Sequence, residues 1–315
     1  MATREDGFNL STPGPVKKIT IAASSADVSA LVFIAEKNGF FVDNGLDVKI
    51  EEYEAGIFAV DAVTANTADF ATVTDFAFVR RLFGGNDLRV VGSIAEANTH
   101  KLVARKDSGI STPADLKGKR IGITSRTTGE YFLGIFLARQ NLSVEDVTIV
   151  DLPPSGLVES ILAGDIDATL TWDPNAFLAS TGLGDNAIVW PGQKDQTLFF
   201  LLIGQESRLK SEPEVVERLL SSLLKAEEYV ANNPEQAKKF TQEKFGYESP
   251  YLESLWPNIS LRVTLPQELL IALEERARWV VRNELVEDGR ILNYLNYIYL
   301  DGLDKIKPEA VTIIR

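Results

Sequence analysis

Cysteine, histidine and methionine are almost missing from this sequence of 315 residues. There is no cysteine, one histidine, His100, and one methionine, Met1. The absence of cysteine excludes disulfides, zinc–thiolate sites, iron–sulfur clusters and cysteine nucleophiles. A single histidine without H-x-x-x-H spacing offers no recognisable metal-binding helix. We therefore expect no bound metal, no cofactor and a structural role for His100.

Positive charge is in deficit. Lys and Arg total 32 against 45 Asp and Glu, a formal net charge of −13, and the isoelectric point is near 4.7. Proteins that bind nucleic acids need a basic surface to neutralise phosphates, and docking on anionic lipid also needs basic residues. The composition therefore predicts that the partner is neither a nucleic acid nor an anionic membrane surface.

Long apolar runs are missing as well. The longest nearly unbroken run is 198–203, whereas a membrane-spanning helix needs ~20 residues. Residues 1–16 lack the apolar segment of a signal peptide, so we expect them to form a disordered tail. Two locations are compatible with this start: the cytoplasm, or an extracytoplasmic site if a leader has been replaced by the start methionine.

What the sequence does contain is an alternation of short β-rich runs and helix-length amphipathic runs. Strands are expected at 19–23, 46–51, 69–73, 88–94, 102–105, 120–123, 147–150 and 168–171, with helices at 29–38, 58–64, 76–83, 131–140 and 157–163. This order is typical of an α/β protein with parallel strands joined by helical crossovers. After Glu206 the pattern becomes almost entirely helical, with helices expected at 213–231, 234–245 and 267–286 and Ser211 as the N-cap of the first.

A weak internal repeat indicates how this α/β part is organised. Residues 65–75 match 163–173 at an offset of 98, 47–50 match 146–149 at an offset of 99, and 18–23 match 120–125 at an offset of 102. Three matches in the same order predict two similar βαβαβ lobes of roughly 100 residues each, a period too long for a solenoid. The alternative is the generic similarity of α/β sequences.

The repeat also predicts where a ligand would bind, because ligands of open parallel sheets lie beyond the carboxyl ends of the strands. In the first lobe the residues at those ends are Ser24, Ser25, Asp27, Gly56, Thr74 and Asp75. In the second they are Ser125, Arg126, Thr127, Thr128, Trp172 and Asp173. Most are small, hydroxyl-bearing or acidic, which suits hydrogen bonding to a small polar ligand held between the lobes.

The segment 124–131 opens a helix and has two interpretations. Its free N–H groups and positive dipole end can hold an oxyanion, with hydroxyl donors from Ser125, Thr127 and Thr128 and a charge from Arg126 if that side chain turns inward. Alternatively, one of these threonines only caps the helix. For Arg126 we favour a solvated side chain.

The aromatic and acidic residues near the expected cleft also have two interpretations. Trp172 offers a flat face to a ligand and Asp173 an acceptor, or else Trp172 packs between the lobes and Asp173 caps the next helix. Asp75, the counterpart of Asp173 in the repeat, has the same alternatives. Asp27 and Glu130 disfavour a bare anion and favour a ligand with N–H or ammonium groups.

Several segments resemble a known family. They are Phe33–Val48, Arg105–Ile110, the run Ala-Asp-Leu-Lys-Gly-Lys-Arg-Ile-Gly at 114–122, Leu162–Ala168, Trp172–Pro174, Pro213–Val216 and Asn233–Gln236. In these segments the chain resembles the nitrate/sulfonate/taurine-type solute-binding proteins of ABC transporters. The same superfamily includes binding proteins for thiamine-pyrimidine precursors, and enzymes of thiamine-pyrimidine and menaquinone synthesis.

The resemblance implies a type II periplasmic-binding-protein fold with two βαβ lobes, a hinge and a helical C-terminal extension. Lobe I would comprise residues 17–97 plus 200–315, and lobe II residues 98–199. It further implies a monomer that captures a small polar organic ligand, organosulfonate-like or pyrimidine- or aromatic-like, and delivers it to an ABC permease outside the cytoplasm. The residues at the strand ends would then be the ligand contacts.

Two other functions remain open at this level. One is an enzyme on the same fold that uses a cleft carboxylate, Asp75, Asp173 or Glu130, as a general base. The pyrimidine-synthesising relatives depend on a histidine and a cysteine-rich segment, and the absence of cysteine here favours a non-enzymatic binder. The other is a sensory domain that uses the same clamp to signal.

Overall fold

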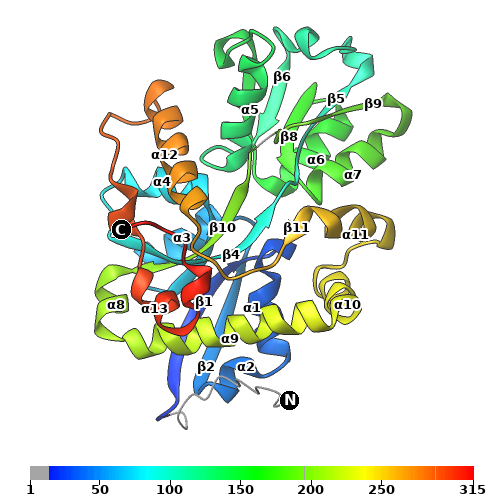
Figure 1. Cartoon of the computed structure of the whole chain (residues 1–315). Coiled ribbons are helices and arrows are strands. Elements are labelled where there is room, and N and C mark those ends of the chain that lie inside the picture. Colours follow the sequence, from blue (N-terminus) through cyan, green and yellow to red (C-terminus); the bar gives the residue numbers. More distant parts are fainter. Residues whose placement is uncertain (1–13, 195, 288) are drawn as a thin grey trace, which may run out of the picture.

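Two β-sheets organise the chain in the computed structural model, which describes residues 14–194, 196–287 and 289–315. The expected tail at 1–16 lies mostly outside the described residues, and residues 14–16 at its end are exposed. We call the part built on the six-stranded sheet lobe I and the part built on the five-stranded sheet lobe II. Figure 1 shows lobe II above lobe I, with the C-terminal end of the chain in lobe I.

The sheet of lobe I has the strand order β11-β4-β10-β3-β1-β2. Its strands are β1 (Lys17–Ser24), β2 (Leu46–Tyr53), β3 (Phe70–Thr74), β4 (Leu88–Ala97), β10 (Leu198–Gln205) and β11 (Ile259–Ser260). β1 pairs in parallel with β2 and β3, whereas β10 is antiparallel to both of its neighbours, β3 and β4.

The sheet of lobe II repeats this arrangement with the order β7-β6-β8-β5-β9. Its strands are β5 (His100–Arg105), β6 (Arg120–Ile123), β7 (Thr148–Asp151), β8 (Ala168–Trp172) and β9 (Ala187–Pro191). β6 is parallel to β7 and β8, and β5 is antiparallel to β8 and β9. The strands β1, β2 and β3 therefore correspond to β6, β7 and β8, which confirms the repeat expected from the sequence.

The parallel strands expected from the sequence form part of each sheet, but both sheets also contain antiparallel strands, and the crossings explain why. β4 of lobe I continues into β5 of lobe II through residues 98–99, and β9 of lobe II returns to β10 of lobe I through residues 192–197. A strand that passes directly from one sheet to the other has no helical crossover to bring its direction into line with the parallel strands. Each crossing therefore delivers an antiparallel strand.

An aspartate before the third strand of each lobe fixes the register in the same way. In lobe I the backbone N–H of Thr20 donates to Asp69 Oδ2 at 2.7 Å, and in lobe II the N–H of Arg120 donates to Asp167 Oδ2 at 2.8 Å. Each aspartate N–H in turn donates to the carbonyl of the same partner residue, at 2.9 Å in lobe I and 2.8 Å in lobe II. The two aspartates occupy matched positions of the repeat, so the similarity extends from the strands to a shared hydrogen-bond pattern.

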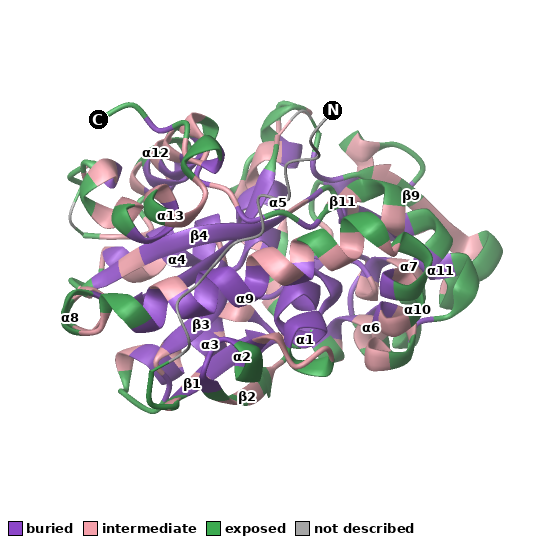
Figure 2. Cartoon of the chain, turned by 60° about the horizontal axis from the view of Figure 1, so that its bottom comes forward, coloured by how far each residue is buried: buried purple, intermediate pink, exposed green. Residues whose placement is uncertain are grey.

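Helices cover both faces of each sheet. In lobe I they are α1 (Ala30–Lys37), α2 (Phe40–Asp43), α3 (Gly56–Thr64) and α4 (Asp75–Leu82), and in lobe II α5 (Thr128–Ala138), α6 (Pro154–Ala163) and α7 (Asn175–Leu183). The inner strands and the inward faces of these helices are buried, while the outer helix faces are exposed (Figure 2). Burial on both faces fits the apolar sequence of β10, whose residues 198–204 are all buried.

The C-terminal part adds helices to lobe I and extends beyond it. These are α8 (Glu206–Ser211), α9 (Pro213–Asn232), α10 (Pro234–Phe245), α11 (Ser249–Leu255), α12 (Gln267–Arg282) and α13 (Leu300–Ile306). Ser211 ends α8 and Glu212 is the N-cap of α9, so the expected cap at Ser211 is wrong. The helix expected at 267–286 ends at Arg282, and Glu284 just beyond it has a positive φ of 54°.

Two helices of this extension touch lobe II. The ring of Trp279 in α12 lies 5.3 Å from that of Tyr131 in α5, and the ring of Tyr251 in α11 lies 5.2 Å from that of Phe177 in α7. In Figure 1, α12 stands beside α4 below α5, and α11 lies at the opposite side of the molecule. Among the described residues, no helix is both long and apolar enough to cross a membrane.

Candidate ligand-binding site

A narrow pocket lies between the two sheets, beside both crossings. The space that it leaves for the centres of water-sized spheres is about 30 Å³. A water molecule needs at least ~10–15 Å³ measured in this way, so the open part holds about two waters. The pocket is therefore a slot with walls close together, and a ligand of several non-hydrogen atoms enters only if the lobes move apart.

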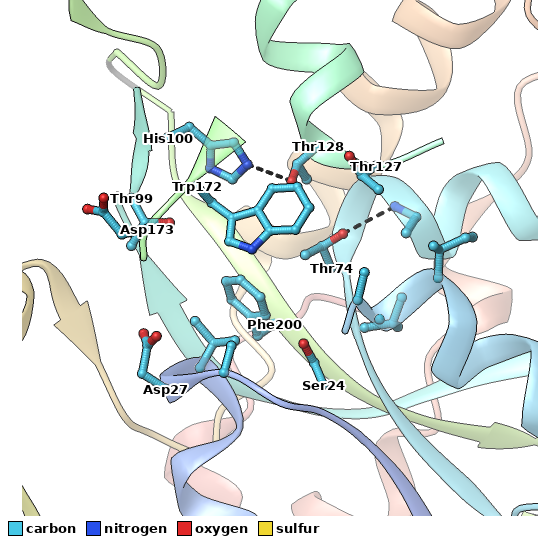
Figure 3. A pocket seen from close by; sticks show the side chains of 17 residues that line it. Ser24, Asp27, Thr74, Thr99, His100, Thr127, Thr128, Trp172, Asp173 and Phe200 are labelled. Atoms are coloured by element: carbon cyan, nitrogen blue, oxygen red, sulfur yellow. Dashed lines mark hydrogen bonds between the residues drawn. The ribbon is translucent and has the colours of Figure 1, made fainter. Parts of the chain in front are cut away.

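Both lobes supply the walls of this slot. The lining residues are Ser24, Ala26, Asp27, Val28, Ala55, Gly56, Ile57, Val73, Thr74, Ala77, Thr99, His100, Thr127, Thr128, Trp172, Asp173 and Phe200. In Figure 3 the indole of Trp172 lies at the centre, with Phe200 and Ser24 below it and His100 above. The chemistry is divided, because lobe I contributes most of the small apolar side chains and lobe II most of the polar ones.

Eight of the twelve residues expected at the strand ends line the slot. They are Ser24, Asp27, Gly56, Thr74, Thr127, Thr128, Trp172 and Asp173. Gly56 is required where α3 approaches β3, because a Cβ there would lie 2.8 Å from the Cα of Val73. The strand-end rule thus brings these residues together, and their binding of a ligand stays a prediction.

Three of the other four expected residues point elsewhere. The Ser25 hydroxyl is exposed and donates to Glu52 Oε2 at 2.9 Å. Ser125 lies in the loop before α5, and its N–H donates to Asp151 Oδ1 at 2.9 Å. Arg126 is exposed, has a positive φ of 62° and lines a separate surface pocket. A left-handed residue turns the chain away from the slot, so the side chains before α5 diverge and only those from Thr127 onward face inward.

Asp75, the fourth, is buried behind the slot in an ion pair. Its Oδ2 lies 3.4 Å from Nη2 of Arg276 in α12, and both side chains are almost wholly inaccessible. It also accepts the backbone N–H groups of Phe76 at 2.6 Å and Phe199 at 3.3 Å. Burial raises the pKa of the carboxyl, and the Arg276 guanidinium opposes that rise. Asp75 therefore joins the C-terminal extension to the sheet and does not reach a ligand.

Asp27 is the carboxylate that lobe I presents to the slot. It lies in the short helical turn Asp27–Ser29 after β1 and is 3% exposed. Its Oδ1 accepts the Tyr247 hydroxyl at 2.9 Å, while its Oδ2 is buried and has no hydrogen-bond partner among the described residues. Burial raises the pKa of Asp27 to about 7, the Tyr247 hydrogen bond opposes the rise, and the nearby Asp173 adds to it.

Asp173 is the carboxylate from lobe II, and it is better compensated. Its Oδ2 pairs with Lys101 Nζ at 2.7 Å, and its Oδ1 accepts the backbone N–H of Phe177 at 3.1 Å, within the first turn of α7. The capping alternative considered from the sequence is thus realised, although Asp173 also lines the slot. Burial raises the pKa of this carboxyl and Lys101 opposes the rise.

His100 lies at the first crossing and was not expected in the site. Its Nε2 lies 2.7 Å from Thr128 Oγ1, and its ring packs 5.8 Å from Trp172 and 4.7 Å from Phe132. Burial lowers the pKa of His100 to about 3, so the imidazole is neutral at physiological pH. Its Nδ1 is buried without a hydrogen-bond partner among the described residues. The histidine thus has the expected structural contacts and also lines the slot.

The start of α5 is occupied by its own cap. Thr127 Oγ1 accepts the N–H of Gly129 at 3.2 Å and donates to the carbonyl of Thr124 at 2.6 Å. The cap therefore uses one of the N–H groups that an oxyanion would need. Of the two sequence interpretations of this segment, the structure supports capping for Thr127.

Sequence reasoning missed the residues that the crossings bring to the slot. Thr99 and His100 stand at the first crossing and Phe200 on the strand after the second. Both crossings run past the gap between the lobes. Residues next to a crossing therefore face this gap, even where they do not follow the end of a parallel strand. The expected lobe boundaries near 97 and 200 were the signal that could have pointed to them.

Comparison with known families gives a match that covers most of the chain. The profile of the family described as NMT1/THI5 like matches residues 27–237. This span contains every expected site residue except Ser24 and Ser25. It ends before α11 and α12, so both helices that touch lobe II from the extension lie outside it.

Relatives and solved structures agree with this match. A Brucella abortus (strain 2308) protein named as a binding protein is 25% identical over 232 residues, 72% of this chain and 70% of that protein. The taurine-binding periplasmic protein of Escherichia coli (strain K12) is 27% identical over 230 residues, 68% of this chain and 67% of that protein. The alkanesulfonate-binding protein of Xanthomonas axonopodis pv. citri, solved with MOPS, superposes with a TM-score of 0.78 at 19% identity, covering 91% of this chain and 99% of that one.

Proposed function

The chain belongs to the NMT1/THI5 like family and has the periplasmic-binding-protein fold, and from this premise we propose that it is a solute-binding protein of an ABC importer. It captures a small polar organic molecule between its lobes and delivers it to a permease. The relatives described above are named as binding proteins, and one of them is named as periplasmic. We accordingly propose a monomer that works outside the cytoplasm.

The observation that carries this proposal is the slot itself. Residues from both lobes face one another across it, and its open space is too small for an organic solute unless the lobes separate. We propose that residues 17–97 with 200–315 move as one body and residues 98–199 as the other. The two short crossings would act as the hinge, and closure would bury the solute.

The contacts of the carboxylates near the slot favour binding without catalysis. Asp75 is engaged with Arg276 and Asp173 with Lys101, so two of the carboxylates considered as general bases already have cationic partners. Glu130 does not line the slot, and its Oε2 accepts the backbone N–H of Arg126 at 3.1 Å. Asp27 has one oxygen without a hydrogen-bond partner among the described residues, and its other oxygen accepts the Tyr247 hydroxyl.

Release of the bound molecule tests this function. The purified protein is unfolded, and the released small molecule is identified by mass spectrometry and then added back to refolded protein. We expect it to return chemically unchanged and to stabilise the fold by about 2.7 kcal/mol at a free concentration of ~100 Kd. Chemical conversion of the molecule on incubation supports the enzyme alternative instead.

A control variant locates the binding. Trp172→Ala removes the central wall of the slot and should abolish the stabilisation, whereas Trp256→Ala, at the end of α11 and outside the slot, should keep it. Equal stabilisation of both variants places the molecule outside the slot and contradicts the proposal.

A further inference from the structure

The charge of the slot is the starting point for a more specific statement about its ligand. Two of its seventeen lining residues are carboxylates, Asp27 and Asp173, and none is Lys or Arg. The two cations behind the wall are engaged, Lys101 with Asp173 at 2.7 Å and Arg276 with Asp75 at 3.4 Å. An anionic ligand would therefore enter a site whose described lining residues have an acidic excess and include no cation.

Two buried atoms of the lining side chains lack a hydrogen-bond partner among the described residues, His100 Nδ1 and the carboxylate oxygen Asp27 Oδ2. Tyr247 donates to Oδ1, and Oδ2 has no partner among the described residues although it is buried. Buried polar atoms are almost always hydrogen-bonded, and an unpaired one destabilises the fold by ~1–3 kcal/mol. A ligand that donates an N–H to Oδ2 would satisfy this atom, whereas a ligand with acceptors alone would leave it unpaired.

The remaining polar groups offer little to an anion. The His100 ring is neutral and its Nε2 is already bonded to Thr128. Thr127 serves the cap of α5. A sulfonate or carboxylate would thus find only uncharged donors, such as the Ser24 hydroxyl, and it would face two carboxylates.

Flat aromatic surfaces complete the arrangement. Trp172 stands in the middle of the slot and Phe200 opposite, with Asp27 to one side (Figure 3). The open space between these walls is narrow. Once the lobes separate, a planar ring can stack between these walls and gain buried area, and an N–H group on that ring would face the side where Asp27 lies.

We propose that the slot selects a planar aromatic ligand with an N–H-donating or cationic group, such as an amidine or an aminated ring, and rejects sulfonates and carboxylates of the same size. Asp27 receives the donor and Trp172 stacks on the ring. This inference rests on the proposed binding function. It separates the chain from the taurine- and alkanesulfonate-binding proteins described above, whose named ligands carry a sulfonate group.

Two probes of equal shape and opposite charge test it. Benzamidine and benzoate are titrated into the full-length protein by calorimetry at about pH 8, where the first is a cation and the second an anion. We expect benzamidine to bind at least ~10-fold more tightly than benzoate, because like charges brought together in a desolvated site repel strongly. Taurine and benzenesulfonate are titrated in parallel and should bind no better than benzoate.

Asp27→Asn assigns the selectivity to one residue. Its affinity for benzamidine should fall ~10-fold or more, the usual effect of losing a hydrogen bond to a charged group. Asp47→Asn removes the same charge from an exposed position on β2 and should change neither affinity. The comparison of the two probes needs only the unaltered protein, so it stands even where a variant folds poorly.

The outcomes separate this inference from the proposed function. Tighter binding of benzoate, taurine or benzenesulfonate, lost in Trp172→Ala, overturns the inference while supporting a solute-binding role. Binding of neither aromatic probe also overturns it, and the released-solute experiment then judges the binding function independently. Selective benzamidine binding that survives Asp27→Asn overturns the role of Asp27.

Discussion

In both lobes an aspartate follows the third strand, but the two aspartates have different partners. β3 is followed by Asp75 and β8 by Asp173, at matched positions of the repeat. Asp75 is wholly buried in an ion pair with Arg276, whereas Asp173 lines the slot and pairs with Lys101, a residue of its own lobe. One aspartate supports the fold, and the other lines the slot.

The C-terminal extension accounts for this difference. Its helix α12 packs on α4 and brings Arg276 to Asp75 from one side and to Tyr131 of lobe II from the other, with Nη1 3.4 Å from the Tyr131 hydroxyl. The last residues of the chain lie in lobe I, and Asp173 has Lys101 of β5 as its partner. The C-terminal extension of lobe I thus keeps Asp75 out of the slot, whereas Asp173 in lobe II lines it.

The largest expected effect on stability is the difference between the substitutions Asp75→Asn and Asp173→Asn. Asp75→Asn leaves the buried Arg276 with only the half-exposed Glu275 as a counter-charge, at 3.5 Å, and removal of one partner from a buried pair destabilises a fold by ~3–5 kcal/mol. Asp173→Asn should destabilise by ~1 kcal/mol or less, because Lys101 is one-third exposed and can turn to water. Urea unfolding of both variants measures the contrast, and equal losses would contradict it.

A double variant distinguishes loss of charge from loss of shape. Replacing both members, Asp75→Asn with Arg276→Met, should recover most of the lost stability, because no buried charge then lacks a partner. Continued instability of the double variant would show that Arg276 matters through its contacts with Tyr131 and not through Asp75.

The second prediction contrasts Asp27 with Asp173 through pH. Tyr247, Tyr251 and Asp173 face Asp27, and none of them is a cation. The pKa of Asp27 is about 7 in the fold against an ordinary 3.8, so the folded state holds an extra proton between these values. The stability that this proton provides is present at low pH and is lost as the pH rises to about 7.

Asp27→Asn should remove that loss. The variant should be more stable than the wild type at about pH 8 by ~1–3 kcal/mol, the usual penalty of an unsatisfied buried group, and the gain should shrink towards pH 4. Urea titrations at several pH values measure it, with Asp47→Asn as the exposed control. Parallel pH curves for the variant and the wild type would show that Asp27 is not held in the protonated form.

Particular residues show how far the sequence alone could predict this molecule. The strand-end rule placed Ser24, Thr127 and Trp172 in the slot, because the carboxyl ends of parallel strands must meet at one edge. It failed for Asp75, since nothing in the local sequence reveals an arginine about 200 residues away that would bury it.

The same limit explains the other differences. The left-handed backbone conformation of Arg126 cannot be predicted from its residue type, and it directs Ser125 away from the slot. Antiparallel β5 and β10 follow from the crossings, which are properties of the whole chain. Local pattern predicts elements and their ends, whereas long-range contacts decide which of those ends a ligand can reach.

The third prediction concerns the contact between the extension and lobe II. Gly134 in α5 faces Trp279 of α12, and a Cβ at this position would lie 2.3 Å from Trp279 Cζ2. Gly134→Ala should destabilise by ~1–3 kcal/mol through overpacking, although alanine is the better helix former. Thermal unfolding measures the change, and small-angle scattering reports whether the lobes move apart.

A glycine of the same lobe provides the control. A Cβ at Gly156 in α6 would meet only Pro153 and Leu152, at 3.5 Å or more. Gly156→Ala should therefore be neutral or stabilise by up to ~1 kcal/mol. Similar losses in both variants would mean that the contact of α12 with α5 has no special part in holding the lobes.

The smallest expected effect compares two hydroxyls on opposite walls of the slot. Thr128 is bonded to His100 Nε2 at 2.7 Å, whereas the Ser24 hydroxyl has no hydrogen bond within the described part of the chain. Thr128→Val should destabilise by ~0.5–1.5 kcal/mol, because it leaves both nitrogens of a buried imidazole unpaired, and Ser24→Ala should have almost no effect on unfolding. Ser24→Ala should instead weaken binding of the released solute, because the Ser24 hydroxyl of lobe I is free to bond a ligand. A loss of stability in Ser24→Ala together with a loss of solute binding in Thr128→Val would contradict this prediction.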